Sequence, residues 1–230
     1  MKRGILEEIR VSRRNKIPVA LITNLDDGTQ QIYRDQDRAA ELDPVLTEKA
    51  REAIRRDQST EVEHASTRYF LQVFSLPLRL FLVGAVHIAQ SLNDMATIAG
   101  FDVSIIDPRE AYADSERFPG VEITRTWPNQ ALNDAAIDHR CAIVTLAHDP
   151  KLDDDALTVA VRSDAFYIGS LGSKKTHAAR LQRLREVGFD ESELARIRGP
   201  VGLAIGAISP AEISVSVLAE VIATLREARC

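Results

Sequence analysis

Short apolar runs alternate with segments of helical periodicity along the chain after residue 77. These runs predict strands over Leu78–Val83, Val103–Asp107, Ala142–Leu146 and Phe166–Ile168. The first run is nearly all apolar, as in a strand that is covered on both faces. Because strands that alternate with amphipathic helices form parallel sheets with crossover helices, we expect a Rossmann-like α/β fold with helices on both faces of the sheet.

Local start and stop signals mark the helices between these strands. The helical spacing of apolar residues after the first strand stops at Gly100, and Asp149 is an N-cap type of residue followed by proline. Ser209 begins the last helix with a capping-box pattern. Ser173 is a candidate N-cap for a helix whose apolar face we expect to comprise Ala178, Leu181, Leu184 and Val187.

The first third of the chain has a different pattern. A turn at Asp26-Asp27-Gly28 separates two short strands, and a helix and two further strands follow. The predicted elements are strands over Ile17–Thr23, Gln30–Arg34, Glu61–Glu63 and Arg68–Phe74 and a helix over Pro44–Arg56. We therefore expect two domains, a small α+β domain over residues 1–76 and the Rossmann-like domain over residues 77–230.

Composition and charge exclude several classes of protein. Of the 230 residues, 45% are apolar and 27% charged, the balance of a globular chain, and the formal net charge of -5 favours neither nucleic acid nor a membrane as partner. The longest apolar stretch, Leu76–Ile88, is too short to span a bilayer, and the N-terminus lacks the features of a signal peptide. We expect a cytoplasmic protein that binds small molecules or other proteins.

The two cysteines predict neither a disulfide framework nor a zinc site. Cys141 lies in an apolar run and is expected to be a buried structural thiol, and Cys230 is the last residue. His148, Asp149 and Asp153 have no recognised metal-ligand spacing, and the capping role already accounts for Asp149. We therefore expect no metal site.

The turn after the first strand of the larger domain is a candidate ligand site. It contains Gly84, Ala85 and His87, and Asp107 ends the next strand, where a ribose-binding carboxylate is expected. Val86 stands where a second glycine would let the backbone approach a pyrophosphate, so the turn either binds a dinucleotide weakly or keeps only the fold. His87 begins the helix, where the helix dipole favours a neutral imidazole, and it either contacts a ligand or packs against the sheet edge.

A glycine-rich loop, Gly169–Lys175, leaves a strand and opens a helix. Gly169 and Gly172 are expected to let the backbone curve, Ser173 to open the helix, and Lys174 to reach the same space as its first N–H groups. The spacing is not that of a Walker A loop. We expect a phosphate-binding loop, and the alternative is a plain turn with solvated lysines.

Taken together, these motifs resemble the XdhC/CoxI family of accessory factors for molybdenum-containing hydroxylases. In the turn and in a later loop, Val86 and Ala204 replace a glycine and an aspartate of the family pattern. The similar segments are Gly84–Ala89, Asp107–Glu110, His148–Asp153, Tyr167–Lys175, Gly199–Leu203, Ser209–Ile213 and Ala219–Glu220.

The resemblance implies a chaperone-like factor, rather than an enzyme, that binds molybdenum cofactor, protects it during sulfuration and helps to insert it into a xanthine dehydrogenase-like hydroxylase. It also implies a homodimer with a cysteine desulfurase and the client hydroxylase as partners. Two alternatives stay open: an NAD(P)-dependent oxidoreductase, favoured by the fold and Asp107 and opposed by Val86, and a partner subunit without a ligand. The candidate cofactor-binding residues are Gly84, Ala85, His87, Asp107, Arg109, His148, Asp149, Gly169, Gly172, Ser173 and Lys174.

Overall fold

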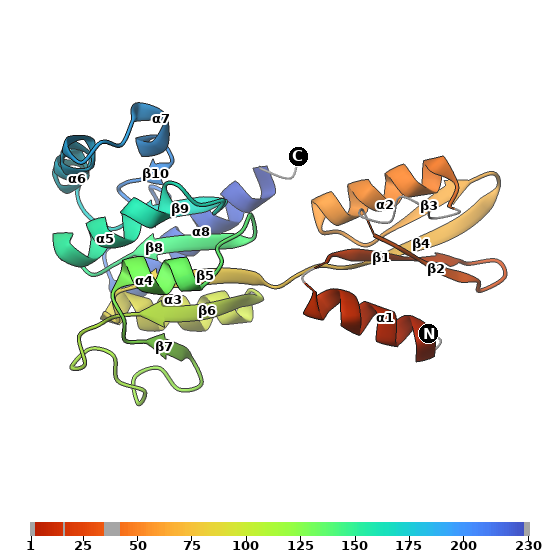
Figure 1. The fold of residues 1–230 in the computed structure, drawn as a ribbon, viewed down its shortest axis with the longest axis horizontal. Coiled ribbons are helices and arrows are strands. Elements are labelled where there is room, and N and C mark those ends of the chain that lie inside the picture. Colours follow the sequence, from red (N-terminus) through yellow and green to blue (C-terminus); the bar gives the residue numbers. More distant parts are fainter. Residues whose placement is uncertain (1–2, 16, 35–41, 228–230) are drawn as a thin grey trace. The chain divides into compact units, whose positions relative to one another are not determined.

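The computed structural model describes residues 3–15, 17–34 and 42–227, which form two compact units, one ending at Leu76 and the other beginning at Pro77. The first unit is a four-stranded antiparallel sheet in the order β2-β1-β4-β3 with two helices (Figure 1). Its elements are α1 (Arg3–Arg14), β1 (Val19–Asn24), β2 (Gln30–Tyr33), α2 (Pro44–Arg56), β3 (Thr60–His64) and β4 (Thr67–Phe74).

A small apolar core holds this unit together. Ala20, Ile22 and Leu71 of the sheet pack with Ala50 and Ala53 of α2, because alternate strand residues and one helix face point to the same side. The hairpin, the four strands and α2 confirm the predicted α+β pattern, whereas α1, half of whose residues are charged, was not predicted.

The second unit is built on a six-stranded sheet, all of whose strand pairs are parallel, in the order β10-β9-β8-β5-β6-β7. This confirms the Rossmann-like α/β class. The elements are β5 (Leu78–Val83), α3 (His87–Ile98), β6 (Phe101–Ile106), β7 (Glu122–Thr124), α4 (Pro128–Asp134), β8 (Cys141–Thr145), α5 (Pro150–Ala160), β9 (Tyr167–Ser170), α6 (Lys174–Glu186), α7 (Glu191–Leu194), β10 (Ile197–Arg198) and α8 (Pro210–Glu227).

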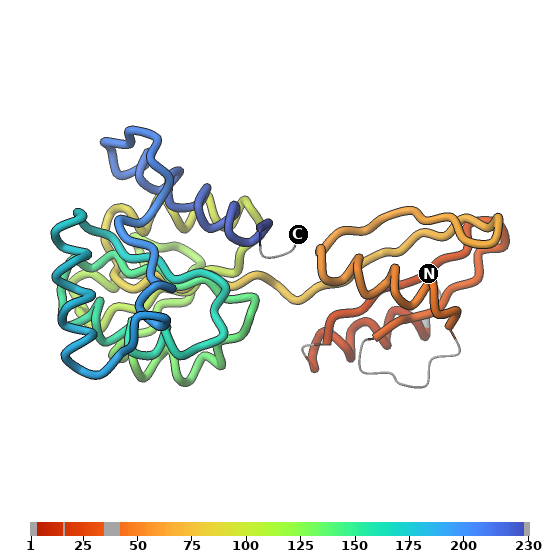
Figure 2. The backbone as a smooth tube through the Cα atoms, turned by 90° about the horizontal axis from the view of Figure 1, so that it is seen from above, coloured from red at the N-terminus to blue at the C-terminus, as the bar shows by residue number. Residues whose placement is uncertain are grey.

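Helices cover both faces of the parallel sheet. Alternate residues of β5 and β6, such as Leu82 and Ile105, pack with α3 and α8 on one face, and α8 runs alongside α3 (Figure 2). The residues between them, such as Phe81 and Ile106, pack with α4 and α5 on the other face. This period-two division explains why β5 has a continuous apolar sequence.

The structure corrects several element bounds. Asp107 and Leu146 lie just beyond β6 and β8 rather than within them, while β9 extends to Ser170 and therefore contains Gly169. The short elements β7, α4, α7 and β10 were not predicted, because none is long enough to show a clear period.

Cys141 begins β8 and is fully buried, which confirms its interpretation as a structural thiol. Burial raises the pKa of this thiol to about 11. Cys230 lies outside the described residues. Among the helices that the structure describes, none has the length and apolarity needed to cross a bilayer.

Candidate functional site

The carboxyl ends of β5, β6, β8 and β9 bring four of the predicted loops to one edge of the sheet. The chain passes from β5 to β6 and β7 on one side and returns through β8 to β9 and β10 on the other, so the switch point lies between β5 and β8. In open α/β sheets ligands bind outside the carboxyl ends at such a point. This edge is therefore the candidate site.

Gly84 lets the loops on the two sides of the switch point approach closely. Its φ is +109°, and a Cβ placed on it would lie 2.8 Å from the backbone nitrogen and Cα of Ala147, which follows β8. A side chain is thus excluded both by conformation and by space. Gly84 therefore allows the β5–α3 turn to approach the loop after β8.

The turn after Gly84 leads directly into α3. The side chain of Val86 is half-buried and packs against the core that α3 and α8 share, so part of it points away from the edge. His87 is the first residue of α3 and is exposed, rather than packed against the sheet. Its side chain is therefore accessible to a ligand above the turn.

Both oxygens of the Asp107 carboxylate accept hydrogen bonds from other groups of the chain. Its Oδ1 accepts from the backbone nitrogen (3.0 Å) and Nε (2.9 Å) of Arg109, and its Oδ2 accepts from Arg109 Nη2 (2.8 Å) and the backbone nitrogen of Ala85 (2.8 Å). Burial opposes ionisation, but the hydrogen bonds from Arg109 and Ala85 outweigh it, so the pKa of Asp107 lies below its usual value. Because four bonds fill a carboxylate, a ribose could bind here only by displacing Arg109.

Arg109 connects this turn to its surroundings. Its guanidinium lies 4.2 Å from the ring centre of Tyr112, and the pair with Asp107 raises its pKa, with smaller contributions from Tyr112 and Asp149. The side chain is 29% exposed and so keeps one face toward solvent at the edge. It is the one member of the Asp107 pair that a ligand could reach.

The loop after β8 contributes His148 and Asp149. His148 is exposed and has a φ of +56°, an unusual conformation for a residue with a side chain and one that is often found at functional sites. Asp149 is the N-cap of α5 and accepts from the backbone nitrogen of Lys151 at 3.0 Å, as expected.

The glycine-rich loop joins β9 to α6, as predicted, but Gly169 belongs to the strand and not to the loop. Gly169 is a buried residue of β9, and a Cβ on it would lie 2.6 Å from Val201 and 2.8 Å from Tyr167, so it serves packing rather than loop curvature. Gly172 does have the positive φ, +144°, that the bend requires.

Ser173 caps α6 by accepting from the backbone nitrogen of Thr176 at 3.1 Å, and the exposed Lys174 is the first residue of the helix. The helix N-terminus, its first N–H groups and a lysine therefore coincide at this end of the sheet. That arrangement suits an anion.

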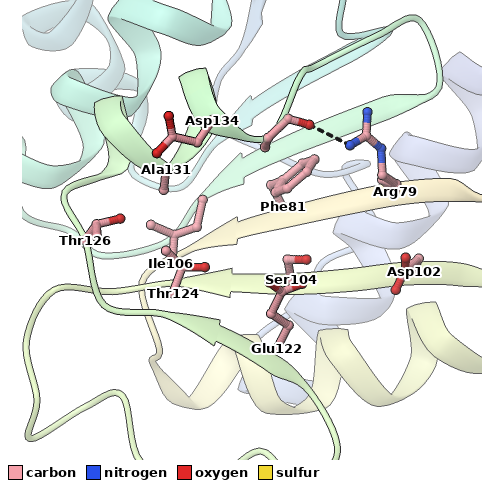
Figure 3. A pocket seen from close by; sticks show the side chains of 11 residues that line it. Arg79, Phe81, Asp102, Ser104, Ile106, Glu122, Thr124, Thr126, Ala131 and Asp134 are labelled. Carbon is pink, nitrogen blue, oxygen red and sulfur yellow. Dashed lines mark hydrogen bonds between the residues drawn. The ribbon is translucent and has the colours of Figure 1, made fainter.

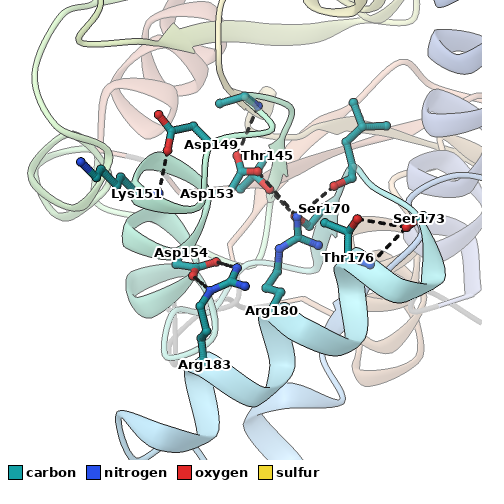
Figure 4. A network of polar contacts seen from close by, with 12 residues as sticks. Thr145, Asp149, Lys151, Asp153, Asp154, Ser170, Ser173, Thr176, Arg180 and Arg183 are labelled. Atoms are coloured by element: carbon teal, nitrogen blue, oxygen red, sulfur yellow. Dashed lines mark hydrogen bonds and ion pairs between the residues drawn. The ribbon is translucent and has the colours of Figure 1, made fainter.

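A buried polar cluster beneath this loop was not predicted (Figure 4). Arg180 and Asp153 are each 2% exposed, with 3.6 Å between Nη2 and Oδ2, and the same Nη2 donates to the carbonyl oxygen of Leu171 at 2.9 Å. Thr145 and Ser170, at the ends of β8 and β9, hydrogen-bond to each other beside the pair. The buried face of α6 thus contains Arg180 and Leu184, whereas Ala178 and Val187 of the predicted apolar face are exposed.

The cluster leaves buried polar atoms unpaired. Arg180 Nε and Nη1 and His177 Nδ1 have no hydrogen-bond partner among the residues that the structure describes. Burial raises the pKa of Asp153 to about 6 against the opposing charge of Arg180, and burial also lowers the pKa of Arg180. Buried polar groups are nearly always hydrogen-bonded, so these nitrogens keep donor or acceptor capacity that no described residue uses.

The signal for this cluster was present in the sequence. His177, Arg180 and Leu184 recur at helical spacing, which places them on one face of the helix. Histidine and arginine usually lie on solvated faces, so the residue types alone do not show that this face is buried. Among the described residues, no group of three or more His, Cys, Asp or Glu side chains is arranged to hold a metal ion.

Comparison with known proteins assigns the chain to a family. Residues 80–221 match the family model of the XdhC Rossmann domain. The chain is 34% identical over 144 residues to the molybdenum cofactor insertion chaperone PaoD of Escherichia coli, covering 63% of this chain and 39% of PaoD. It is also 34% identical over 160 residues to a probable xanthine dehydrogenase subunit of Bacillus subtilis, covering 69% of this chain and 46% of that protein. The chain thus spans less than half the length of these relatives.

A solved structure resembles the whole fold. The crystal structure of a protein from Bacillus halodurans, described as a xanthine dehydrogenase, superposes with a TM-score of 0.73 and 23% identity, covering 98% of this chain and 65% of that one. At this identity the match concerns the fold.

Proposed function

Because this chain belongs to the XdhC family, whose Rossmann domain it matches over residues 80–221, we propose that it binds molybdenum cofactor and assists its insertion into a molybdenum hydroxylase. A relative named as a molybdenum cofactor insertion chaperone supports this proposal. The partners in the proposal are the client hydroxylase and a cysteine desulfurase that sulfurates the cofactor. The chain acts as a homodimer in the cytoplasm, as a chaperone rather than an enzyme.

The observation that carries the proposal is the buried guanidinium beneath the anion loop. Two nitrogens of Arg180 have no hydrogen-bond partner among the described residues. The third lies 3.6 Å from Asp153 and donates to Leu171, directly before Gly172 and the start of α6. The pterin cofactor carries a phosphate, and a helix N-terminus, a lysine and a buried arginine together form a setting that favours an anion. In this proposal Ser173 and Lys174 bind the phosphate and Arg180 supplies charge from below.

The remaining candidates have two kinds of role in the proposal. His87, His148 and Asp149 lie on the turns at the same edge and would contact the rest of the cofactor. Gly84, Asp107, Gly169 and the buried Ala85, whose backbone nitrogen donates to Asp107, position those turns. Arg109 joins the two groups because it is bound to Asp107 and partly exposed.

A nicotinamide-dependent oxidoreductase is the weaker alternative. The fold favours it, but the carboxylate of Asp107 already accepts four hydrogen bonds from Arg109 and Ala85, so it lacks a free acceptor for a ribose.

The test is cofactor content after purification from a host that makes molybdenum cofactor, measured by mass spectrometry and by fluorescence of the oxidised pterin. Ser173→Asp keeps a good N-cap but places a negative charge at the phosphate position, so the variant should stay folded and lose the cofactor. Lys174→Ala should weaken binding about tenfold or more and make it less dependent on salt, because one charge-assisted hydrogen bond contributes about 1.5 to 3 kcal/mol.

Lys49→Ala, which alters an exposed lysine of α2 paired with Glu52, is the matched control and should leave cofactor content unchanged. If Ser173→Asp and Lys174→Ala are both folded by circular dichroism and retain the cofactor of the original chain, the anion loop is not the binding site.

A further inference from the structure

A groove of about 420 Å³ lies on one face of the parallel sheet and runs along β6 and β7 from Asp102 to Ile106 and Thr124 (Figure 3). Its floor and one wall are apolar, formed by Phe81 of β5, Ile106 of β6 and Ala131 of α4. Three carboxylates from three different elements, Asp102, Glu122 and Asp134, also line it. The groove lies within the unit that begins at Pro77.

The groove lies on the face of the sheet that α4 and α5 cover. These helices pack over β5 and β8, whereas on this face Ser104 of β6 and Glu122 of β7 line the groove. The connection from β6 to β7, residues 107–121, packs on the opposite face, where Phe118 and Val121 join the core of α3 and α8. An open sheet face with apolar residues at its base is a surface that a partner can cover.

The charges around the groove are unbalanced. Asp102, Glu122 and Asp134 are exposed, and none of them forms an ion pair with another described residue. The one basic lining residue, Arg79, is committed elsewhere: it donates to the carbonyl oxygens of Ala135 and Ala136, each at 2.7 Å, and to Asp138 at 3.0 Å.

Fold stability does not account for these carboxylates. Asp134 lies in the last turn of α4, where the helix dipole disfavours a negative charge. Asp102 stands opposite Arg79 of β5, but the guanidinium of Arg79 is bonded to Ala135, Ala136 and Asp138, and Glu122 stands opposite the uncharged Ser104. Trp127, which follows the lining residue Thr126, is 53% exposed. Exposed tryptophan beside a charged groove is typical of protein interfaces.

We propose that this groove docks a segment of a partner protein that presents arginine or lysine side chains. The long apolar stems of these residues fit a floor of Phe81 and Ile106, and their charged ends meet the three carboxylates. None of the residues proposed to bind the cofactor lines the groove, so this proposal does not depend on the proposed function.

The experiment measures fluorescence anisotropy of a labelled peptide of alternating arginine and leucine added to the full chain, with a glutamate–leucine peptide as the probe control. The arginine peptide should bind more tightly than the glutamate peptide. The triple variant Asp102→Asn, Glu122→Gln and Asp134→Asn should stay folded, lose about tenfold or more in affinity and show a weaker dependence on salt.

A second triple variant, Asp164→Asn, Glu186→Gln and Glu227→Gln, changes the net charge equally at exposed carboxylates outside the groove and should bind as the original chain does. Equal losses in both triple variants would mean general charge attraction and would overturn the proposal, as would equal binding of the two peptides. Self-association of the chain that only the groove variant abolishes would assign the groove to a second copy instead.

Discussion

At the residue scale, the buried pair of Asp153 and Arg180 is the most unusual feature of the molecule. Both side chains are withdrawn from water, and burial shifts the pKa of each toward its neutral form. Asp153 Oδ1 accepts from the backbone nitrogen of Ala147 at 3.2 Å, so the pair also holds the loop after β8. We expect this carboxyl group to make the stability of the fold depend on pH.

The pKa of Asp153 is about 6 in the folded chain, against 3.8 for an ordinary aspartate. The folded state therefore binds a proton more tightly than the unfolded state, so its contribution to the free energy of unfolding is complete below about pH 4 and is lost as the pH rises to about 6. The loss should be roughly 3 kcal/mol at most. Urea denaturation across this range should show it, and Asp153→Asn should remove it.

Asp164→Asn is the control for this measurement, because Asp164 is exposed. The difference in stability between the original chain and the control should not vary over the same pH range. If Asp153→Asn follows the original chain at every pH, the carboxyl group of Asp153 titrates normally.

At the element scale, the site depends on how closely the β5–α3 turn approaches the loop after β8. We predict that Gly84→Ala lowers the free energy of unfolding by roughly 2 to 4 kcal/mol, because a Cβ there meets the backbone of Ala147 at 2.8 Å in addition to the strain of a positive φ. Gly100→Ala, at the other end of α3, has a φ of +87° but nothing within 4 Å, so it should cost only about 1 kcal/mol.

Chemical denaturation of the two variants separates two effects. Both substitutions strain a positive φ, but only Gly84→Ala also brings a Cβ against the backbone of Ala147. Similar losses of stability in Gly84→Ala and Gly100→Ala would mean that the two loops can move apart. The close approach would then not be a fixed feature of the site.

At the scale of the whole molecule, two separate cores predict two units that lose stability independently. Leu71→Ala removes a fully buried side chain from the core of the first unit, and Val144→Ala does so in the second. The first change should cost about 2 to 5 kcal/mol and accelerate hydrogen exchange in residues 17–74 alone, and the second should act on residues 78–227 alone. Hydrogen exchange with mass spectrometry gives this separation.

Faster exchange throughout the chain in either variant would contradict a boundary between Leu76 and Pro77. It would mean that the two cores unfold as one cooperative unit.

The sequence by itself determined the elements whose signals are local. The bounds of α2 and β5 match their predictions, and Asp149 and Ser173 cap helices as expected, because a cap needs only a side chain and the N–H groups two or three residues further on. The joint order of the motifs was also enough to indicate the family, which the match over residues 80–221 confirms.

The tertiary structure alone decided what the same residues do. Gly169 packs against Val201, Asp107 is saturated by Arg109 and Ala85, and Arg180 is buried rather than solvated. Apart from the local Asp107–Arg109 bonds, each of these contacts joins residues that are far apart in the sequence. The type of a residue does not show which distant residue it will meet in the fold. The open groove has the same origin, because whether a face of the sheet is covered depends on which helices pack there.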